Sequence, residues 1–174
     1  MQQTMSERVV GWLMTKFGCV LFDIGKPDGL YMKRWFLYGK RIGDSCRLML
    51  HRFYRSDSDE AMHDHPWAFW SLIIWPGYYE ETVEVDEIAT AYGQGPTQYC
   101  TVRRWKWPGM VLRRPALWRH RVILAKNKDG TERRCWTLVW TGLKERSWFF
   151  YCPKGPVPWR EFIARQDSRK AGCE

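Results

Sequence analysis

Two histidines separated by one residue are the side chains in this sequence best suited to bind a metal. His63 and His65 lie in the stretch Ala61-Met-His-Asp-His-Pro-Trp67, which runs directly into an apolar segment. In an extended chain, alternate side chains point to the same face, so this stretch directs His63 and His65 together and Asp64 away from them. Two imidazoles placed in this way converge on one point.

His120 is the candidate for a third ligand. The chain has four histidines, and His120 also lies at the edge of an apolar run, Val122-Ile-Leu-Ala125. Neutral imidazoles bind borderline divalent metals, including zinc, iron, copper and nickel. Structural zinc sites are usually closed and rich in cysteine, so an open face of three histidines predicts a site for water, substrate or dioxygen.

Short β-strands are the elements expected to position these histidines. Thr4-Met-Ser-Glu7 has the form of a capping box and predicts an N-terminal helix that ends near Gly18, while Trp159, Phe162 and Ile163 predict a short C-terminal helix. Between the helices, aromatic and β-branched runs predict roughly ten strands. They include residues 30–38, 47–54, 67–75, 78–85, 98–105, 110–113, 119–125, 133–141 and 147–152.

Closely spaced turns between short strands predict an all-β domain, either an antiparallel barrel or a sandwich. Pro76-Gly77 is expected to join 67–75 and 78–85 in a hairpin, with Glu80 and Glu84 on the face opposite Val83 and Val85. The Gly-rich segment 91–96 is expected to be a loop. At 174 residues the chain suits one domain. We divide it into a helix at 1–18, a barrel at 19–158, and a C-terminal helix and tail at 159–174.

Charge and cysteine usage limit the partners and the compartment. The formal charge of +9 favours acidic partners, namely nucleic acid, phosphate or carboxylate ligands or an anionic surface, although a solvated basic face also explains it. Six widely spaced cysteines without a C-x-x-C pair predict free thiols in a reducing cytosol. The only apolar run near the N-terminus is short and follows the acidic Glu7, so we expect a cytoplasmic protein with no membrane partner.

The spacing of these residues resembles the two motifs of the cupin superfamily. The first motif has H-x-H, then a glutamate and a glycine. Here His63 and His65 are followed by Trp70 at the glutamate place and by Gly77, while Asp57 stands in place of the leading glycine. The second motif is matched by Gly109, Pro115 and His120, with Leu117 and Leu124 in place of its inner glycine and final asparagine. The resemblance covers about 60 residues. It implies a double-stranded β-helix, or jelly-roll barrel, that binds a metal through three histidines.

Replacement of the motif glutamate by Trp70 leaves the charge of a divalent metal uncompensated by the protein, so an anionic ligand should be drawn to it. Among cupins, three histidines without a glutamate are similar to the thiol dioxygenases, which use non-haem iron(II) and a thiolate substrate. That subfamily commonly has cysteine where Trp70 stands. The resemblance therefore favours iron(II), with zinc, manganese or nickel as alternatives.

Four further residues are candidates for binding the substrate. His51 shares a strand face with Met49 and Phe53, and it can act as a fourth ligand, a proton carrier or a core histidine. Arg52, on the other face of that strand, offers a planar fork to a carboxylate or phosphate, unless it is simply a surface arginine. Trp70 and Tyr78 either line the pocket or belong to the core.

Three functions compete. The first is a metal-dependent oxidoreductase, a dioxygenase that acts on a small anionic substrate, for which a thiol is one candidate. The second keeps the barrel but uses zinc, manganese or nickel in an isomerase or hydrolase. The third is a binding module without turnover for a small molecule or for nucleic acid, the latter bound by Arg103-Arg104-Trp105-Lys106-Trp107. Because cupins often pair through exposed strands, the resemblance also implies a homodimer.

Overall fold

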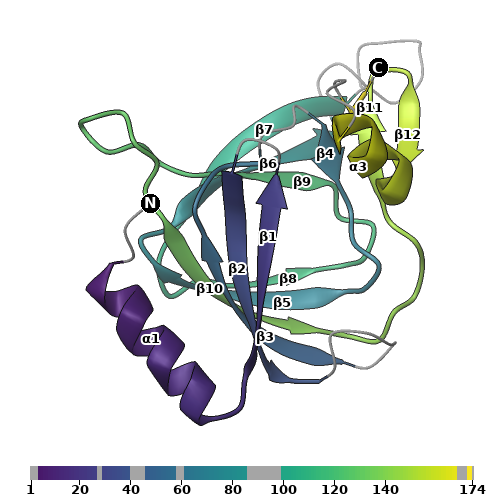
Figure 1. Cartoon of the computed structure of the whole chain (residues 1–174). Helices are drawn as coiled ribbons and strands as arrows, with labels where there is room; N and C mark the ends of the chain where they lie inside the picture. Colours follow the sequence, from purple (N-terminus) through teal and green to yellow (C-terminus); the bar gives the residue numbers. More distant parts are fainter. Residues whose placement is uncertain are drawn as a thin grey trace.

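The computed structural model describes residues 4–26, 29–39, 46–57, 61–85, 99–167 and 172–173. Within these ranges it has two helices and twelve strands (Figure 1). The helices are α1 (Met5–Lys16) and α3 (Trp159–Asp167). The strands are β1 (Val20–Lys26), β2 (Gly29–Tyr38), β3 (Arg47–Phe53), β4 (Met62–His63), β5 (Phe69–Trp75), β6 (Tyr78–Val85), β7 (Tyr99–Lys106), β8 (Val111–Arg114), β9 (His120–Ile123), β10 (Cys135–Thr141), β11 (Phe149–Cys152) and β12 (Gly155–Pro158).

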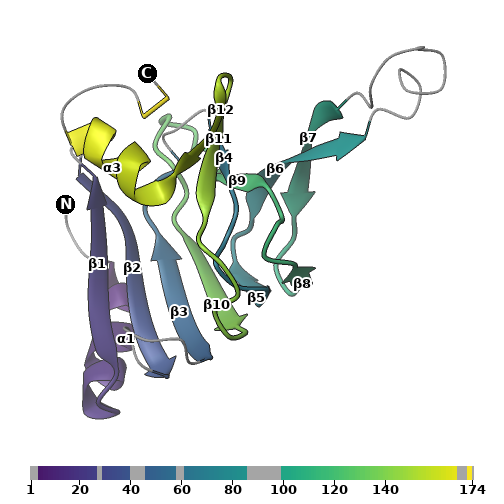
Figure 2. The ribbon, with the colours of Figure 1, turned by 90° about the vertical axis from the view of Figure 1, so that its right-hand side faces the viewer.

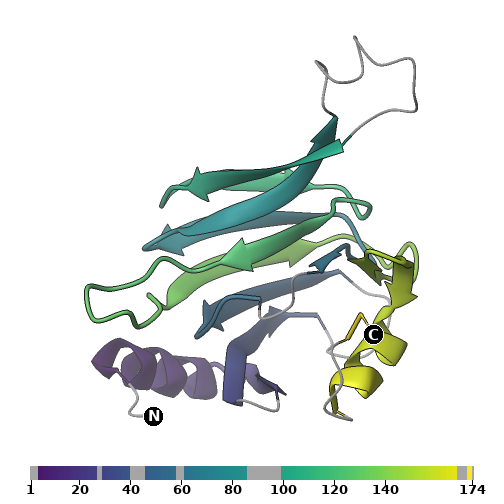
Figure 3. The same ribbon diagram turned by 90° about the horizontal axis from the view of Figure 1, so that it is seen from above.

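The strands form two six-stranded antiparallel sheets. Sheet A has the order β1-β2-β3-β10-β5-β8, and Figure 2 shows these strands side by side. Sheet B has the order β12-β11-β4-β9-β6-β7, and its β6–β7 hairpin extends beyond the rest of the barrel (Figure 3). Strands adjacent in space are often distant in sequence, as in a jelly roll. The predicted all-β barrel with short helices at its two ends is confirmed, whereas the proposed domain boundaries stay a prediction.

The predicted hairpin between residues 67–75 and 78–85 is wrong. β5 pairs with β10 and β8 in sheet A, whereas β6 pairs with β7 and β9 in sheet B, so the turn at Pro76 and Gly77 carries the chain from one sheet to the other. Gly77 has φ of 106°, and a Cβ there would lie 2.5 Å from the carbonyl oxygen of Lys106. Glycine is therefore required by both the backbone and the neighbouring strand. The predicted loop at 91–96 lies outside the described residues.

Helix α1 begins at the predicted capping box and rests on the outer face of sheet A. Thr4 N–H donates to a Glu7 carboxylate oxygen at 2.6 Å, and the Thr4 hydroxyl accepts from Glu7 N–H at 3.4 Å. The same Glu7 carboxylate is buried against sheet A, where it pairs with Arg52 at 3.5 Å and with Arg134 at 3.3 Å. One acidic side chain thus caps the helix and anchors it to the sheet.

The interior has a polar layer between two apolar clusters. Arg34 on β2, His51 on β3 and Thr137 on β10 are direct register partners and form one row across the inner face of sheet A. The cluster on one side of the row contains Tyr31, Met32, Phe53, Ile73, Tyr78, Leu112, Val122, Leu124 and Cys135. The cluster on the other side contains Phe36, Met49, Phe69 and Val139. Both sheets supply residues to the first cluster, so the sheets pack face to face around this layer.

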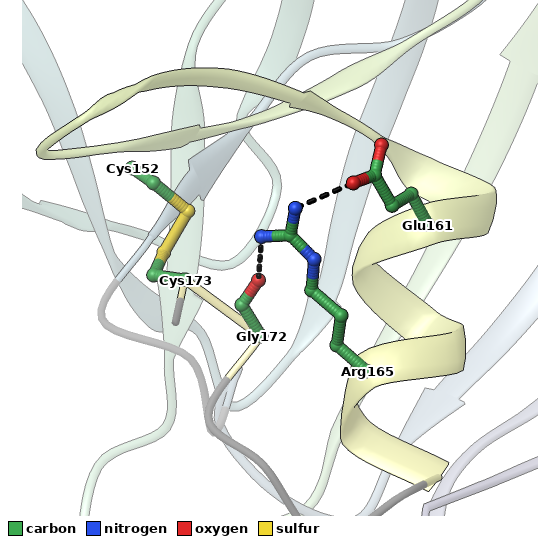
Figure 4. Close-up of a disulfide and its surroundings, with 5 residues drawn as sticks. All are labelled: Cys152, Glu161, Arg165, Gly172 and Cys173. Carbon is green, nitrogen blue, oxygen red and sulfur yellow. Dashed lines mark hydrogen bonds and ion pairs between the residues drawn. A yellow bond between two sulfur atoms is a disulfide. The ribbon is translucent and has the colours of Figure 1, made fainter.

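The C-terminal segment is held to the barrel by rings and by a disulfide. Phe162 of α3 stacks on Phe150 of β11 with ring centroids 3.7 Å apart. Cys152 and Cys173 form a disulfide beside the Glu161–Arg165 pair of α3 (Figure 4). The prediction that all six cysteines are free is therefore wrong for this pair, while Cys19, Cys46, Cys100 and Cys135 carry free thiols. Neither described helix is long and apolar enough to cross a membrane.

Candidate metal centre

The three predicted ligands meet in sheet B. His63 on β4 is the direct register partner of His120 on β9, and His65 follows two residues after His63. The backbone N–H of His65 donates to Ala116 C=O at 3.0 Å, which holds this stretch beside the chain that leads into β9. One ring nitrogen from each histidine lies within 4.8 Å of the other two, and the Nε2 atoms of His65 and His120 are 2.8 Å apart.

The tautomer of His120 follows from its second ring nitrogen. Nδ1 of His120 lies 2.9 Å from Oε1 of Glu80. An ionised carboxylate only accepts hydrogen bonds, so Nδ1 carries the proton and donates it. In the neutral ring, Nε2 then presents its lone pair toward His65. Two nitrogens at about 2.1 Å from one ion and at right angles would be about 3 Å apart, so the separation of 2.8 Å fits shared coordination of a divalent metal.

Glu80 is ionised and fully enclosed. Its side chain is 1% exposed, and Arg114 on β8 donates to both of its oxygens, with Nε at 3.0 Å from Oε1. Nζ of Lys106 on β7 lies 3.3 Å from Oε2. Burial alone would raise the pKa of Glu80, but hydrogen bonds from His120 and Arg114 hold it well below its usual value. The carboxylate therefore keeps its negative charge next to the three histidines.

His65 is neutral, as a metal ligand must be. Burial is the main reason that its pKa lies well below the ordinary value, and the charges of His120, His63 and Arg34 lower it further. The charge of Arg34 reaches His65 from the opposite sheet, so the polar row of sheet A and the histidines of sheet B share one interior. Neutral imidazole keeps a lone pair for a metal across the physiological pH range.

Asp64 fixes the extended stretch between the two histidines. As the strand alternation predicts, its side chain points away from them, and it is completely buried. Its carboxylate accepts hydrogen bonds from Arg146, from Phe149 N–H at 2.8 Å and from the Tyr151 hydroxyl at 2.7 Å. These three partners come from the segment leading into β11 and from β11 itself. The spacing of His63 and His65 is therefore set by a carboxylate that does not face the site.

Aromatic rings cover the histidines. The Phe69 ring lies 4.7 Å from the His65 ring, and the rings of Phe150 and Trp148 lie 5.6 Å and 6.0 Å from His63. Trp148 in turn stacks on Trp159 of α3 with centroids 5.5 Å apart. This cover excludes water from one side of the cluster and ties the C-terminal helix to it.

The opposite wall of the interior is basic. Arg34 donates from Nε to Nε2 of His51 at 3.0 Å, and no carboxylate of the described residues pairs with it. The Thr137 hydroxyl, next to His51 in the register, is buried and has no hydrogen-bond partner among the same residues. Burial is the main cause that lowers the pKa of Arg34 to about 10, and the charge of Arg47 adds to it. The wall thus offers an unpaired cation and an unused hydroxyl.

Comparisons with known proteins agree with this architecture at the level of the fold. No family model matches the sequence, and no curated protein matches it. Among solved structures, a cupin-2 domain protein from Rhodospirillum rubrum has a TM-score of 0.51 and 10% identity, over 79% of this chain and 78% of that one. The chain has a cupin-like fold. At 10% identity, the likeness concerns the fold of the cupin-like barrel and no particular reaction.

Two other structures are more distant. Hydroxypropylphosphonic acid epoxidase from S. wedmorenis has a TM-score of 0.46 and 10% identity over 71% of this chain and 55% of its own, so the chain spans little more than half of that enzyme. The DMSP lyase DddQ from Ruegeria pomeroyi has a TM-score of 0.46 and 13% identity over 82% of this chain and 65% of its own. Both TM-scores are too low to bear on fold or function.

The four predicted substrate residues fall on two sides of the cupin-like barrel. His51 and Tyr78 are buried on its inner side, and burial raises the pKa of Tyr78. Arg52 lies on the outer face of sheet A, where it pairs with Glu7 and stacks over Trp136 at 4.6 Å. Trp70 is also on the outer face and is 51% exposed. Neither Arg52 nor Trp70 lies with the three histidines, because strand alternation turns both outward.

The sequence did not single out three residues of the site, Arg34, Glu80 and Thr137. Arg34 alternates with Met32 and Phe36, both of which are buried, so an arginine at an inward position was the available signal. Glu80 was expected on the charged face of its strand with Glu84. The predicted alternation of side chains along this strand was right, but the structure shows that the face with Glu80 points into the barrel at that residue.

Proposed function

We propose that the protein is a metal-dependent oxidoreductase in which His63, His65 and His120 hold a divalent metal, with iron(II) favoured, and in which the substrate is a small anion. The observation that carries the proposal is the convergence of three histidine nitrogens, two of them 2.8 Å apart, in a cupin-like barrel. Three neutral donors that approach from one side leave coordination positions for other ligands.

The anionic substrate is inferred from charge. Three neutral histidines leave both positive charges of a divalent ion uncompensated within the ligand set. Arg34 adds a cation on the facing wall, and no carboxylate in the described part of the chain pairs with it. A molecule with one negative group bound to the metal and a second negative group bound to Arg34 would neutralise the charge at each place. The guanidinium of Arg34 keeps its two Nη groups for this purpose, because Nε is taken by His51.

Each part of the barrel would have a separate task. Arg34 and the Thr137 hydroxyl would bind the anionic group, and His51 would keep the guanidinium in its plane. Phe69, Trp148 and Phe150 would exclude water from the histidines. Iron(II), when bound, would supply the electron-transfer chemistry that activates dioxygen. With zinc, manganese or nickel, the same ligands would support an isomerase or hydrolase instead.

Partners and location complete the proposal. Among the alternatives, binding of nucleic acid is disfavoured because Arg103 and Arg104 are paired with Glu81 and Glu84. A homodimer and a cytoplasmic location remain proposals. The Cys152–Cys173 disulfide is of a type that persists mainly in oxidising compartments, so the location needs its own test by fractionation.

Metal binding is tested first, and turnover second. Protein stripped by a chelator is titrated with Fe(II), Co(II), Zn(II), Mn(II) and Ni(II) under anaerobic conditions. His120→Ala and His65→Gln should lose binding by at least 100-fold, whereas His51→Gln, which changes the histidine outside the cluster, should bind normally. Iron-loaded protein should then consume oxygen in the presence of a small thiol carboxylate. Equal metal binding by wild type and His120→Ala, with both folded by circular dichroism, would refute the site.

A further inference from the structure

A carboxylate contacts the histidine cluster from outside the place that the glutamate of the first cupin motif occupies. Trp70 takes its place in the sequence, and this side chain points outward from sheet A. Glu80, on the strand that follows, instead reaches His120 from behind and accepts a hydrogen bond from Nδ1 at 2.9 Å. The carboxylate therefore contacts a ligand and not the position of the ion.

The surroundings of Glu80 hold its carboxylate in one orientation. Arg114 donates to both oxygens through Nε and Nη2, and Nζ of Lys106 lies 3.3 Å from Oε2. His120, Arg114 and Lys106 come from β9, β8 and β7, so three strands converge on one side chain that is 1% exposed. With both oxygens engaged, Glu80 has little freedom to rotate away from His120.

We propose that Glu80 is a positioning residue of the metal centre: it fixes the ring of His120 with Nε2 toward the metal. The inference rests on the proposed metal site. A histidine whose second nitrogen donates to a carboxylate is oriented and made more basic, and loss of such a partner typically weakens metal binding by 10- to 100-fold.

Glu81 provides a matched control. It is the next residue of the same strand, it is also nearly buried at 4% exposure, and it is also held by two arginines, Arg103 and Arg121. It faces the other side of sheet B and has no contact with the histidines among the described residues. Glu81→Gln therefore measures the cost of losing a buried, arginine-paired carboxylate from β6 without altering His120.

The experiment compares Glu80→Gln and Glu81→Gln as folded, chelator-treated proteins. Co(II) is the probe, and both its dissociation constant and its visible absorption spectrum are measured at one fixed pH. We expect Glu80→Gln to bind Co(II) 10- to 100-fold more weakly with an altered spectrum, and Glu81→Gln to stay within threefold of wild type with an unchanged spectrum. Equal affinities and spectra for the two variants would overturn the proposal.

A measurement on the wild-type protein covers the case in which Glu80→Gln does not fold. In the metal-free wild type, ¹⁵N NMR of the histidine rings should show His120 protonated at Nδ1, and the opposite tautomer would overturn the proposal. Failure of wild type to bind any divalent metal would refute the proposed function instead. The tautomer would still decide whether Glu80 orients His120, so the two failures are distinguishable.

Discussion

Removal of the positive charge of Arg34 should stabilise the metal-free protein. In Arg34→Gln, the amide nitrogen stands at the same place along the side chain as Nε of arginine. The hydrogen bond to His51, 3.0 Å long in the structure, can therefore be kept while the charge and both Nη groups are lost. Arg34 is a half-buried cation with no carboxylate partner among the described residues. Such a cation opposes folding, so its removal relieves the folded state of an unfavourable charge.

The magnitude follows from the pKa of Arg34. Burial, with a smaller contribution from Arg47 and against an opposing one from Tyr31, lowers this pKa from 12.5 to about 10. A difference of that size corresponds to about 3 kcal/mol between the charged and neutral forms. Water in the interior reduces the effect, so we expect the free energy of unfolding to rise by about 1–3 kcal/mol. The charged form is disfavoured in the folded state at any pH below about 10, so the gain should be present throughout the neutral range.

Urea denaturation of the metal-free protein at neutral pH measures this gain. Lys33→Gln is the control, because Lys33 precedes Arg34 on β2 but faces α1 on the outside of the barrel. Acetate, a small carboxylate probe, should raise the melting temperature of the wild type and have no effect on Arg34→Gln. Two results together would refute a destabilising charge at Arg34. Arg34→Gln would be less stable than Lys33→Gln by more than about 1 kcal/mol, and acetate would shift the melting temperatures of wild type and Arg34→Gln alike.

Three other predictions concern stability. Burial, followed by the charge of Arg34, keeps the pKa of His51 well below its ordinary value. As the pH falls, the unfolded chain is therefore protonated at His51 first, and the free energy of unfolding should fall by up to about 1.4 kcal/mol per pH unit below about pH 6.5. Urea melts in which wild type and His51→Gln lose stability equally steeply with pH would contradict this. Cys173→Ser opens the loop closed with Cys152 and should cost about 3 kcal/mol in the same assay, whereas an unchanged midpoint would mean that the bond does not form. Gly77→Ala should lower the melting temperature by several degrees, because its Cβ would clash with the backbone at φ of 106°, and calorimetry that finds no loss would disprove that constraint.

The ligand set could be predicted from the sequence because its geometry is local. Alternation along an extended chain is enough to bring His63 and His65 to one face, and it also places Asp64 on the other. The third ligand, His120, was predicted from its place at the edge of an apolar run and from motif spacing, and the antiparallel pairing of β4 with β9 places it opposite His63. The predicted strand boundaries also lie close to the observed ones, since runs of β-branched and aromatic residues mark the strands directly.

Pairing between strands could not be predicted in the same way. Pro76-Gly77 between two apolar runs is typical of a hairpin turn, but composition does not say whether the strands on either side stay in one sheet. What decides it here is a tertiary contact, since Gly77 packs against Lys106 and Trp105 of β7. This contact belongs to the pairing of β6 with β7, a strand distant from Gly77 in sequence, so the sheet crossing was not visible in the sequence.

The inward direction of charged residues was equally hidden. A period of two separates the faces of a strand, but it does not say which face is inside when both carry polar groups. In β6, Glu80 and Glu81 are both buried, one inside the barrel and one beneath two arginines. Glu80 therefore had to be found in three dimensions, where its partners Lys106, Arg114 and His120 come from strands distant in sequence.

The polar layer is costly for the fold, and that cost is itself an argument for a bound anion. A core selected for stability alone would carry apolar side chains at Arg34, His51 and Thr137, since their neighbours along each strand belong to the two apolar clusters. Instead, the layer holds an unpaired cation and a hydroxyl without a partner among the described residues. A ligand with one negative charge and two oxygen acceptors would satisfy both groups at once. Its binding should therefore stabilise the barrel as well as complete the metal centre.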